Sequence, residues 1–277
     1  MGPLPDLAST AYVTTLYSDS YAAAVATLGH SLRKTNTSSR LIVLYFPDKV
    51  SKQALCVATA SGFVPHPVQR IMPPENGRGM HPHFVDQYTK LTLWTLDTLP
   101  EPVRALVYLD ADMLVLANID ELFSLPYNFA AVPDVYFTTD INAGLLFIRP
   151  SSAVYDAMRA ALGVARYPRG FAEQALLNVF FAADMLRLPF TYNGNIAIKD
   201  RTPAMWEGIR DDMRIIHYTD VKPFVSHSWK NVPLDRLEER IREAGREKGG
   251  IWREEMEAWG SVWRETLATY ADHLAQC

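Results

Sequence analysis

The sequence predicts an α/β fold built on a mostly parallel central sheet flanked by helices. Apolar runs of the kind that are buried in parallel sheets alternate with segments that favour helix. One of these runs, residues 105–109, leads directly into Asp110-Ala111-Asp112. Open α/β sheets bind their ligands at the carboxyl ends of strands, so the pattern that predicts the fold also predicts where its site lies.

The amino-terminal half supplies the regular alternation. Residues 11–17 are rich in β-branched and aromatic side chains and predict the first strand. The elements expected next are a helix at 22–28, an apolar strand at 41–46, a helix around 51–60 and a strand at 63–65. Strands and helices at this spacing form βαβ units with right-handed crossovers, which predicts a parallel sheet.

The second half extends the sheet. The elements expected there are helices at 88–94 and 171–178 and strands at 105–109, 130–133, 144–148 and 215–218. These segments predict a single domain over residues 1–233, followed by a helical tail over residues 234–277.

Three tryptophans mark the tail. Spacings of seven and four place Trp252, Trp259 and Trp263 on one helical face. We expect this stripe to pack on the domain or on a second subunit, the latter giving a homodimer. Binding to a membrane surface is a further alternative, which the glutamates of the tail disfavour because surface-binding helices are rich in Lys and Arg.

Composition excludes several classes of protein. The formal net charge of −4 lacks the basic footprint of a general nucleic-acid-binding protein. The two cysteines, Cys56 and Cys277, predict neither a disulfide framework nor a zinc site, and a reducing compartment is the simplest setting. The first residues lack a signal-peptide pattern, and no run reaches the ~20 apolar residues that span a bilayer. We therefore expect a cytoplasmic protein without an integral membrane segment.

The Asp110/Asp112 pair is the sharpest chemical signal. Ionised carboxylates are costly to bury without a partner, and residues two apart in an extended segment point the same way. Such oxygen ligands favour Mg²⁺ or Mn²⁺ with diphosphate oxygens completing the shell. Asp-x-Asp also occurs by chance in solvated turns and helix caps. The sequence has neither G-x-G-x-x-G nor a Walker A lysine, so a bound diphosphate would need the metal to neutralise its charge.

Several short segments, taken in order, carry a resemblance to a known family. They are Tyr88-Thr89-Lys90-Leu91, Tyr108–Val115, Asn118–Phe123, Asn142-Ala143-Gly144, Phe171-Ala172-Glu173-Gln174, and His217-Tyr218 with Lys222-Pro223. Over roughly residues 11–230 the chain resembles the retaining glycosyltransferases of family eight, the group of glycogenin and galactinol synthase. The resemblance implies a single GT-A-type nucleotide-sugar-binding domain that uses a UDP-sugar and Mn²⁺, with Mg²⁺ as an alternative metal.

The resemblance also implies a metal site. Matched by position, Asp110 and Asp112 hold the metal, and His217 is the third protein ligand. Without the family, His217 would be more typical of a hydrogen-bonded interior histidine. As a ligand, its neutral imidazole needs a second group that orients the other ring nitrogen.

The donor-binding residues follow in the same way. Lys222 matches the lysine that contacts the diphosphate and steadies the departing UDP, and Lys90 the lysine near the donor sugar, although a helix lysine is ordinarily a surface residue. Tyr21 falls where the family binds uridine, where it could stack on the base, although an aromatic there is more often part of the core. The remaining donor-binding positions are Thr15, Tyr17, Asp110, Ala111, Asn142, Ala143 and Gly144. Gly144 gives the backbone freedom for a close approach to a ligand.

Glu173 and Gln174 are the expected catalytic pair, together with Lys222. The resemblance places Glu173 against sugar hydroxyls and Gln174 near the anomeric carbon. Ala175 follows where some bacterial members have aspartate, so an aspartate nucleophile is not available there. Gln174 is a poor nucleophile, which favours front-face transfer over double displacement; both routes stay open.

The expected activity is transfer of a hexose from UDP-glucose or UDP-galactose, or from UDP-N-acetylglucosamine, to a hydroxyl acceptor. The segment 188–193 matches the one before glycogenin's own acceptor tyrosine, but residues 196–201 contain no tyrosine, so self-glucosylation is not expected. The loop 73–83 and the segment 199–210 are the expected acceptor walls, because loops over rigid strands carry specificity. The alternatives are galactinol synthase-like transfer to inositol, a silent UDP-sugar-binding protein and, least in keeping with the motifs, a phosphohydrolase.

Overall fold

The structure is a computed structural model that describes residues 7–136, 140–226 and 230–277. Its strands are β1 (Thr10–Leu16), β2 (Arg40–Tyr45), β3 (Val64–Pro67), β4 (Ala105–Leu109), β5 (Met113–Val115), β6 (Phe129–Pro133), β7 (Ile141–Ile148), β8 (Leu186–Arg187), β9 (Gly194–Asn195) and β10 (Ile215–His217). Its helices are α1 (Ala22–Lys34), α2 (Lys52–Thr59), α3 (Ser152–Ala161), α4 (Ala172–Phe180), α5 (Ala197–Arg201), α6 (Pro203–Ile209), α7 (Leu237–Ala244), α8 (Arg253–Thr269) and α9 (Ala271–Leu274).

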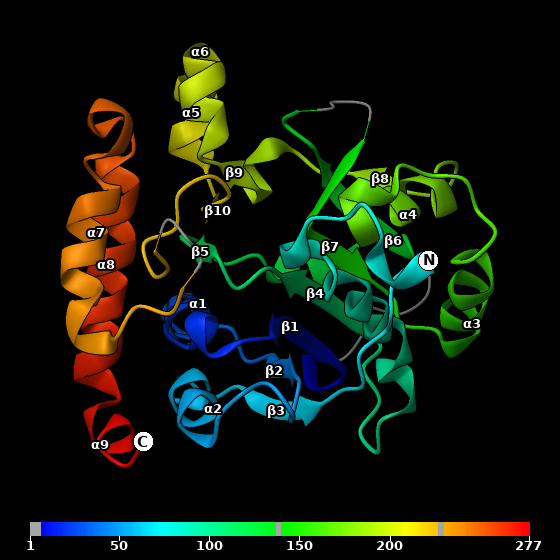
Figure 1. The fold of residues 1–277 in the computed structure, drawn as a ribbon, viewed down its shortest axis with the longest axis horizontal. Coiled ribbons are helices and arrows are strands. Elements are labelled where there is room, and N and C mark those ends of the chain that lie inside the picture. The colour runs from blue at the N-terminus through cyan, green and yellow to red at the C-terminus, as the bar shows by residue number, and fades with distance from the viewer. Residues whose placement is uncertain (1–6, 137–139, 227–229) are drawn as a thin grey trace.

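A seven-stranded sheet forms the centre of the molecule, in the order β3-β2-β1-β4-β7-β6-β8 (Figure 1). Strands β3, β2, β1 and β4 are parallel, and β7 runs antiparallel between β4 and β6. Side chains alternate between two cores: Tyr12 belongs to the core under α1 and α2, and Val13 to the core under α3 and α4. The expectation of a mostly parallel sheet flanked by helices is confirmed.

A second sheet, β5-β10-β9, positions the site. Strand β10 pairs antiparallel with β5, in the register His217 opposite Met113. Because β5 directly follows the turn that holds Asp110 and Asp112, this pairing brings His217 beside the aspartates from more than a hundred residues away in sequence. The two carboxylates were expected on an extended segment; instead β4 ends at Leu109, and Met113 N–H donates to Asp110 O (3.2 Å) across a tight turn.

The helix expected at 88–94 is instead part of a 3₁₀ helix, Gln87–Thr98. Three threonines spaced three residues apart explain the tighter winding. The hydroxyls of Thr92, Thr95 and Thr98 each donate to the carbonyl oxygen three residues earlier, at 2.6–2.8 Å. This segment delivers Lys90 into the interior, where its side chain is buried.

The carboxy-terminal helices pack on the same chain. Helix α8 lies against α1 and α7 along one side of the molecule (Figure 1). Trp252, Trp259 and Trp263 are all buried, Trp252 Nε1 donates to Ile196 O (2.9 Å), and Trp259 packs on Phe224. The tryptophan stripe is therefore covered by its own domain. In the described part of the chain, no helix combines the length and the apolarity needed to cross a membrane.

The prediction that the cysteines form no disulfide is wrong for this structure. Cys56 of α2 and Cys277 are bonded, across a sequence separation of 221 residues. Counting cysteines says nothing about which residues the fold brings together. Here α8 runs back along α1 and packs on it, so the chain end arrives beside α2.

Candidate active site

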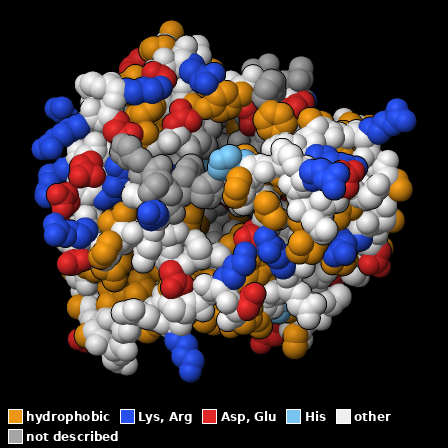
Figure 2. Space-filling model, in the orientation of Figure 1, with side chains coloured by type: hydrophobic (Ala, Val, Ile, Leu, Met, Phe, Trp, Pro, Cys, Tyr) orange, Lys and Arg blue, Asp and Glu red, His pale blue; other side chains and the backbone are white. Residues whose placement is uncertain are grey.

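A cavity of about 730 Å³ opens at the carboxyl ends of β1 and β4, where the first and second sheets meet. Near the centre of the face in Figure 2 the surface is hollowed. Every residue expected to bind the donor or the metal lines this cavity. The fold therefore brings together residues that are spread over more than two hundred positions of sequence.

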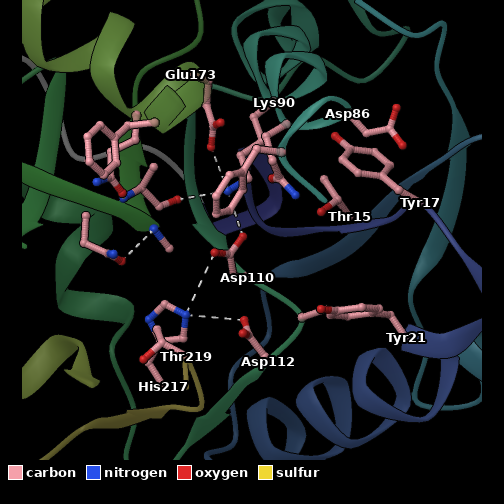
Figure 3. A pocket seen from close by; sticks show the side chains of 18 of the residues that line it. Thr15, Tyr17, Tyr21, Asp86, Lys90, Asp110, Asp112, Glu173, His217 and Thr219 are labelled. Atoms are coloured by element: carbon pink, nitrogen blue, oxygen red, sulfur yellow. Dashed lines mark hydrogen bonds and ion pairs between the residues drawn. The ribbon is translucent and has the colours of Figure 1, made fainter. Parts of the chain in front are cut away.

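Asp110, Asp112 and His217 form its most polar cluster (Figure 3). His217 Nε2 lies 3.4 Å from Asp112 Oδ1 and 3.9 Å from Asp110 Oδ2. Ligand atoms of all three residues lie within 4.8 Å of one another. Two carboxylates and an imidazole nitrogen that face a common point fit a divalent cation such as Mn²⁺.

Asn193 sets the orientation of His217. Its Oδ1 lies 2.8 Å from His217 Nδ1, and because an amide oxygen only accepts, Nδ1 carries the proton. Nε2 is then left to face the two aspartates. The sequence analysis missed Asn193, because it used segment 188–193 only to look for an acceptor tyrosine. The available signal was that Asn193 is a polar residue at the end of the matched segment 188–193, directly before β9.

Lys222 supplies the positive charge closest to the cluster. Its Nζ forms an ion pair with Asp112 and donates to Tyr218 O at 2.8 Å. Burial alone would raise the pKa of Asp112, but Lys222 and His217 outweigh it and hold that pKa below its usual range. Asp112 is therefore kept ionised although it is buried.

Lys90 is not a surface lysine. Its Nζ lies 2.9 Å from Asp110 Oδ1 and 3.0 Å from Glu173 Oε1, and 5.0 Å from the Tyr108 ring centre. Burial lowers the pKa of Lys90, but the two carboxylates more than compensate and raise it above the ordinary value. Burial raises the pKa of Glu173, even with Lys90 beside it. Lys90 thus joins the metal-ligand cluster to the expected catalytic pair.

Gln174 is held at both ends of its amide. Its Oε1 accepts from Ala143 N–H (3.0 Å), and its Nε2 donates to Asp134 Oδ2 (3.2 Å). Asn142 Nδ2 also donates to Asp134 (3.1 Å), and Asn142 Oδ1 accepts from Asn193 (2.9 Å). A continuous hydrogen-bonded chain therefore runs from Gln174 to His217. Asp134 was missed by the sequence analysis, since its only signal was its place just after a strand.

Close packing explains why residue 144 is a glycine. A Cβ atom built there would lie 2.5 Å from His217 Cε1 and 2.9 Å from Met113 Cε. The expectation was that the glycine lets backbone approach a ligand. In the structure, the group that it admits is the ring of His217.

The other end of the cavity is aromatic. Tyr17 stacks on Phe46 with ring centres 4.3 Å apart, and Tyr21 packs edge-on against Phe224 at 5.1 Å. In Figure 3 Tyr17 and Tyr21 lie on the side away from His217, with Thr15 between Tyr17 and the centre. Among described residues the Tyr17 hydroxyl has no hydrogen-bond partner. This end offers aromatic rings to a flat group, while the Tyr17 hydroxyl itself is buried.

Exposed aromatic side chains surround the mouth, which we call the aromatic rim: Phe84, Tyr136 and Phe171. They are 42–46% exposed, far more than the buried rings of the core. Tyr136 donates to Asp220 Oδ1 (2.8 Å), and the Arg201 guanidinium lies 4.0 Å from its ring centre. Of the expected acceptor walls, loop 73–83 contributes Pro82 to the described lining, and segment 199–210 contributes nothing directly.

The carboxy-terminal helices support the segment that carries Lys222. Arg240 of α7 is buried, and its Nε donates to Lys222 O (3.2 Å) and Val225 O (2.7 Å). Tyr218 OH donates to Glu255 O of α8 (2.7 Å). The tail is therefore structurally continuous with the site.

Comparison with known proteins agrees with this geometry. A family model described as glycosyl transferase family 8 matches residues 12–227. The chain is 31% identical over 240 residues to a glycogenin of Neurospora crassa, covering 83% of this chain and 33% of that protein. It is 27% identical over 253 residues to galactinol synthase 6 of Arabidopsis thaliana, covering 77% and 72%. The chain thus spans a third of the length of the Neurospora protein.

Solved structures share the fold. The galactosyltransferase LgtC, solved in complex with donor and acceptor sugar analogues, aligns with a TM-score of 0.55 at 17% identity. The alignment covers 88% of this chain and 99% of LgtC. At this identity the likeness concerns the arrangement of helices and strands.

Proposed function

Because this chain belongs to glycosyl transferase family 8, we propose that it transfers a hexose from a UDP-sugar to a hydroxyl acceptor with retention of configuration. UDP-glucose and UDP-galactose are the donors we favour, and UDP-N-acetylglucosamine is the third to test. One observation carries the proposal most strongly. A cluster suited to a divalent cation, a lysine beside it and an aromatic end lie in one cavity.

We assign the metal to Asp110, Asp112 and His217, with Mn²⁺ as the expected ion. When bound, it would neutralise diphosphate charge and so favour departure of UDP. The donor set fits, because Asn193 holds the proton on Nδ1 and leaves Nε2 for the ion. Lys222 then stabilises negative charge on the leaving diphosphate, since its ammonium already lies against Asp112.

We assign the uridine end to Thr15, Tyr17 and Tyr21, and the sugar end to Lys90, Asn142 and Glu173. Ala111, Ala143 and Gly144 contribute the backbone between them. Asp134 joins the sugar end, because it lines the cavity and its carboxylate accepts hydrogen bonds from the side chains of Asn142 and Gln174 and from Tyr136 N–H. This division follows the cavity, which is aromatic at one end and rich in hydrogen-bonding groups at the other.

The contacts of Gln174 favour front-face transfer. Both ends of its amide are engaged, so it positions the sugar and does not attack it. Glu173 is ion-paired with Lys90 and buried, which suits a group that grips hydroxyls. The acceptor hydroxyl would then attack on the face that UDP leaves, while a phosphate oxygen of the leaving group takes its proton.

The aromatic rim is our choice for the acceptor site, because it borders the sugar end and is still exposed. Self-glucosylation at Tyr192 is disfavoured, since its hydroxyl donates to Glu121 (2.8 Å) and the residue lies outside the described cavity lining. Transfer to inositol remains an alternative acceptor chemistry within the same proposal.

The test is UDP release from the three UDP-sugars, measured with Mn²⁺ and with EDTA. We expect one donor to be hydrolysed slowly without acceptor, in a metal-dependent manner, and Asp112→Asn to lose this release. Asp156→Asn, an equal change on an exposed face of α3, is the control and should keep it. Metal-dependent UDP binding without any release, with candidate acceptors present, would favour a silent binding protein. Absence of UDP binding would refute the proposal.

A further inference from the structure

A second group of metal-ligating side chains lies outside the cavity. Cys56 comes from α2, His273 from α9, and Cys277 follows His273 by four residues. One ligand atom from each lies within 4.8 Å of the others. None of the three lines the donor cavity, so this group needs its own explanation.

The spacing suits one shared ligand. Cys277 N–H donates to Leu274 O (3.2 Å), so the helical turn continues beyond α9 and places His273 and Cys277 on the same side. His273 Nε2 lies 3.8 Å from Cys56 Sγ and 2.9 Å from Cys56 O. A disulfide uses only the two sulfurs. The imidazole adds a third donor atom that the Cys56–Cys277 bond does not require.

We propose that the reduced protein binds Zn²⁺ between Cys56, His273 and Cys277, and that the disulfide is the oxidised, metal-free state of the same site. Two thiolates and an imidazole are typical zinc ligands, with water at the fourth position. They discriminate against Mn²⁺, which prefers the oxygen-rich set at Asp110 and Asp112. One chain would thus hold two sites of opposite ligand preference.

The interconversion is a two-electron exchange with a low-molecular-weight disulfide. The two zinc-bound thiolates give up one electron each and form the Cys56–Cys277 bond, and Zn²⁺ is released. The small disulfide accepts the two electrons, its sulfur–sulfur bond breaks, and the two thiolates formed take protons from water according to their pKa. The cysteines are partly exposed and His273 is exposed, so metal, reductant and oxidant can all reach the site.

Either state fastens the chain end to α2. The neighbouring polar contacts include His30 Nδ1 to Tyr270 OH (3.3 Å), His30 Nε2 to Glu265 (3.7 Å) and the exposed pair Lys34–Glu265, which contribute little, while Leu274 packs on the core. The reduced, metal-free protein is therefore the state in which the last turn is least constrained. Zinc should raise the melting temperature of the reduced protein and leave that of the oxidised protein unchanged.

The test is titration of the full chain, reduced with a phosphine and freed of metal, with Co²⁺ and then Zn²⁺. An Asp112→Asn background removes binding at the cavity. We expect one equivalent of Co²⁺ with thiolate charge-transfer bands, displaced by Zn²⁺. Cys277→Ser should abolish the bands, and His273→Ala should weaken affinity about tenfold or more because it removes a direct ligand. His66→Ala is the histidine control and should change nothing.

Oxidised glutathione should release the bound zinc stoichiometrically, as followed with a zinc-sensitive dye. Variants with native circular dichroism and unchanged unfolding midpoints in EDTA, under reducing conditions, exclude misfolding as the cause of lost binding. Absence of thiolate bands in the reduced protein would overturn the proposal. So would equal affinities for His273→Ala and the unaltered chain, since the two cysteines alone would then account for binding.

Discussion

The floor and the rim of the cavity are built in different ways. The floor consists of the polar side chains at the centre of the site. Lys90 is ion-paired with Asp110 and Glu173, and Lys222 with Asp112, while hydrogen bonds join Gln174, Asp134, Asn142, Asn193 and His217. On the rim, Phe84, Tyr136 and Phe171 are 42–46% exposed, and Phe84 and Phe171 each end a short 3₁₀ helix. A connected floor suits chemistry that is common to many acceptors. On a rim of separate side chains, a single substitution could change the preferred acceptor without altering the floor.

Lys222→Met should have the largest effect, because it removes the charge beside the leaving group. We expect UDP release to fall about 10²- to 10³-fold. The change also leaves Asp112 without its ion-pair partner, so the metal-free variant should melt earlier than the unaltered protein. Mn²⁺ should then raise its melting temperature by more than it raises that of the unaltered protein.

The measurements are a coupled UDP assay and thermal melts with and without Mn²⁺. Lys52→Met, on an exposed position at the start of α2, is the matched control. Unchanged turnover in Lys222→Met would show that the floor does not stabilise the leaving group through this lysine.

Asn193→Leu tests whether the floor works as a connected unit. It removes the acceptor for His217 Nδ1–H, and we expect Mn²⁺ affinity to fall about 10- to 100-fold. Asn193→Asp keeps an acceptor oxygen there and should retain most of the affinity. Titration calorimetry with Mn²⁺ and UDP measures both. Equal losses in the two variants would mean that the residue matters for packing and not for the orientation of His217.

Phe171→Ala should have the smallest effect, and one limited to the acceptor. Loss of one stacking surface should raise the acceptor KM about 3- to 10-fold. Slow donor hydrolysis without acceptor should stay the same, because the floor is untouched. Tyr127→Ala removes an aromatic side chain that is about as exposed (43%) and lies outside the described cavity lining, so it should change neither quantity. A fall in donor hydrolysis in Phe171→Ala would erase the distinction between floor and rim.

The sequence predicts those parts of the fold and site that lie in local patterns and motifs, and it misses those that depend on contacts between distant segments. Apolar periodicity predicted the α/β fold, and the resemblance of the ordered motifs predicted the family. Both predictions are confirmed. The floor residues Asp110, Asp112, Lys90 and His217 stand in those motifs. Asp134 and Asn193 do not, because their roles depend on hydrogen bonds between segments distant in sequence.

Contacts made only by the folded chain were the ones missed or misjudged. The Cys56–Cys277 bond joins residues with no shared motif, and only the return of α8 along α1 brings them together. Segment 199–210 was expected as an acceptor wall from its place in the sequence. In the structure, Arg201 does not line the cavity but packs against the ring of Tyr136, which does. The segment is also helical, since α5 and α6 occupy most of it, and the place where these helices pack is set by tertiary contacts that local pattern does not encode.

The hydrogen bonds from Arg240 to the Lys222 segment bear on the order in which the site assembles during synthesis. Synthesis proceeds from the amino terminus, so the parallel strands and both aspartates emerge from the ribosome well before His217, and His217 before α7 and α8. Tyr17 and Phe46 can pack early, but Tyr21 waits for Phe224, and the segment that carries Lys222 gains its support only when α7 has emerged. The aromatic end and the segment of Lys222 are therefore both completed late in synthesis.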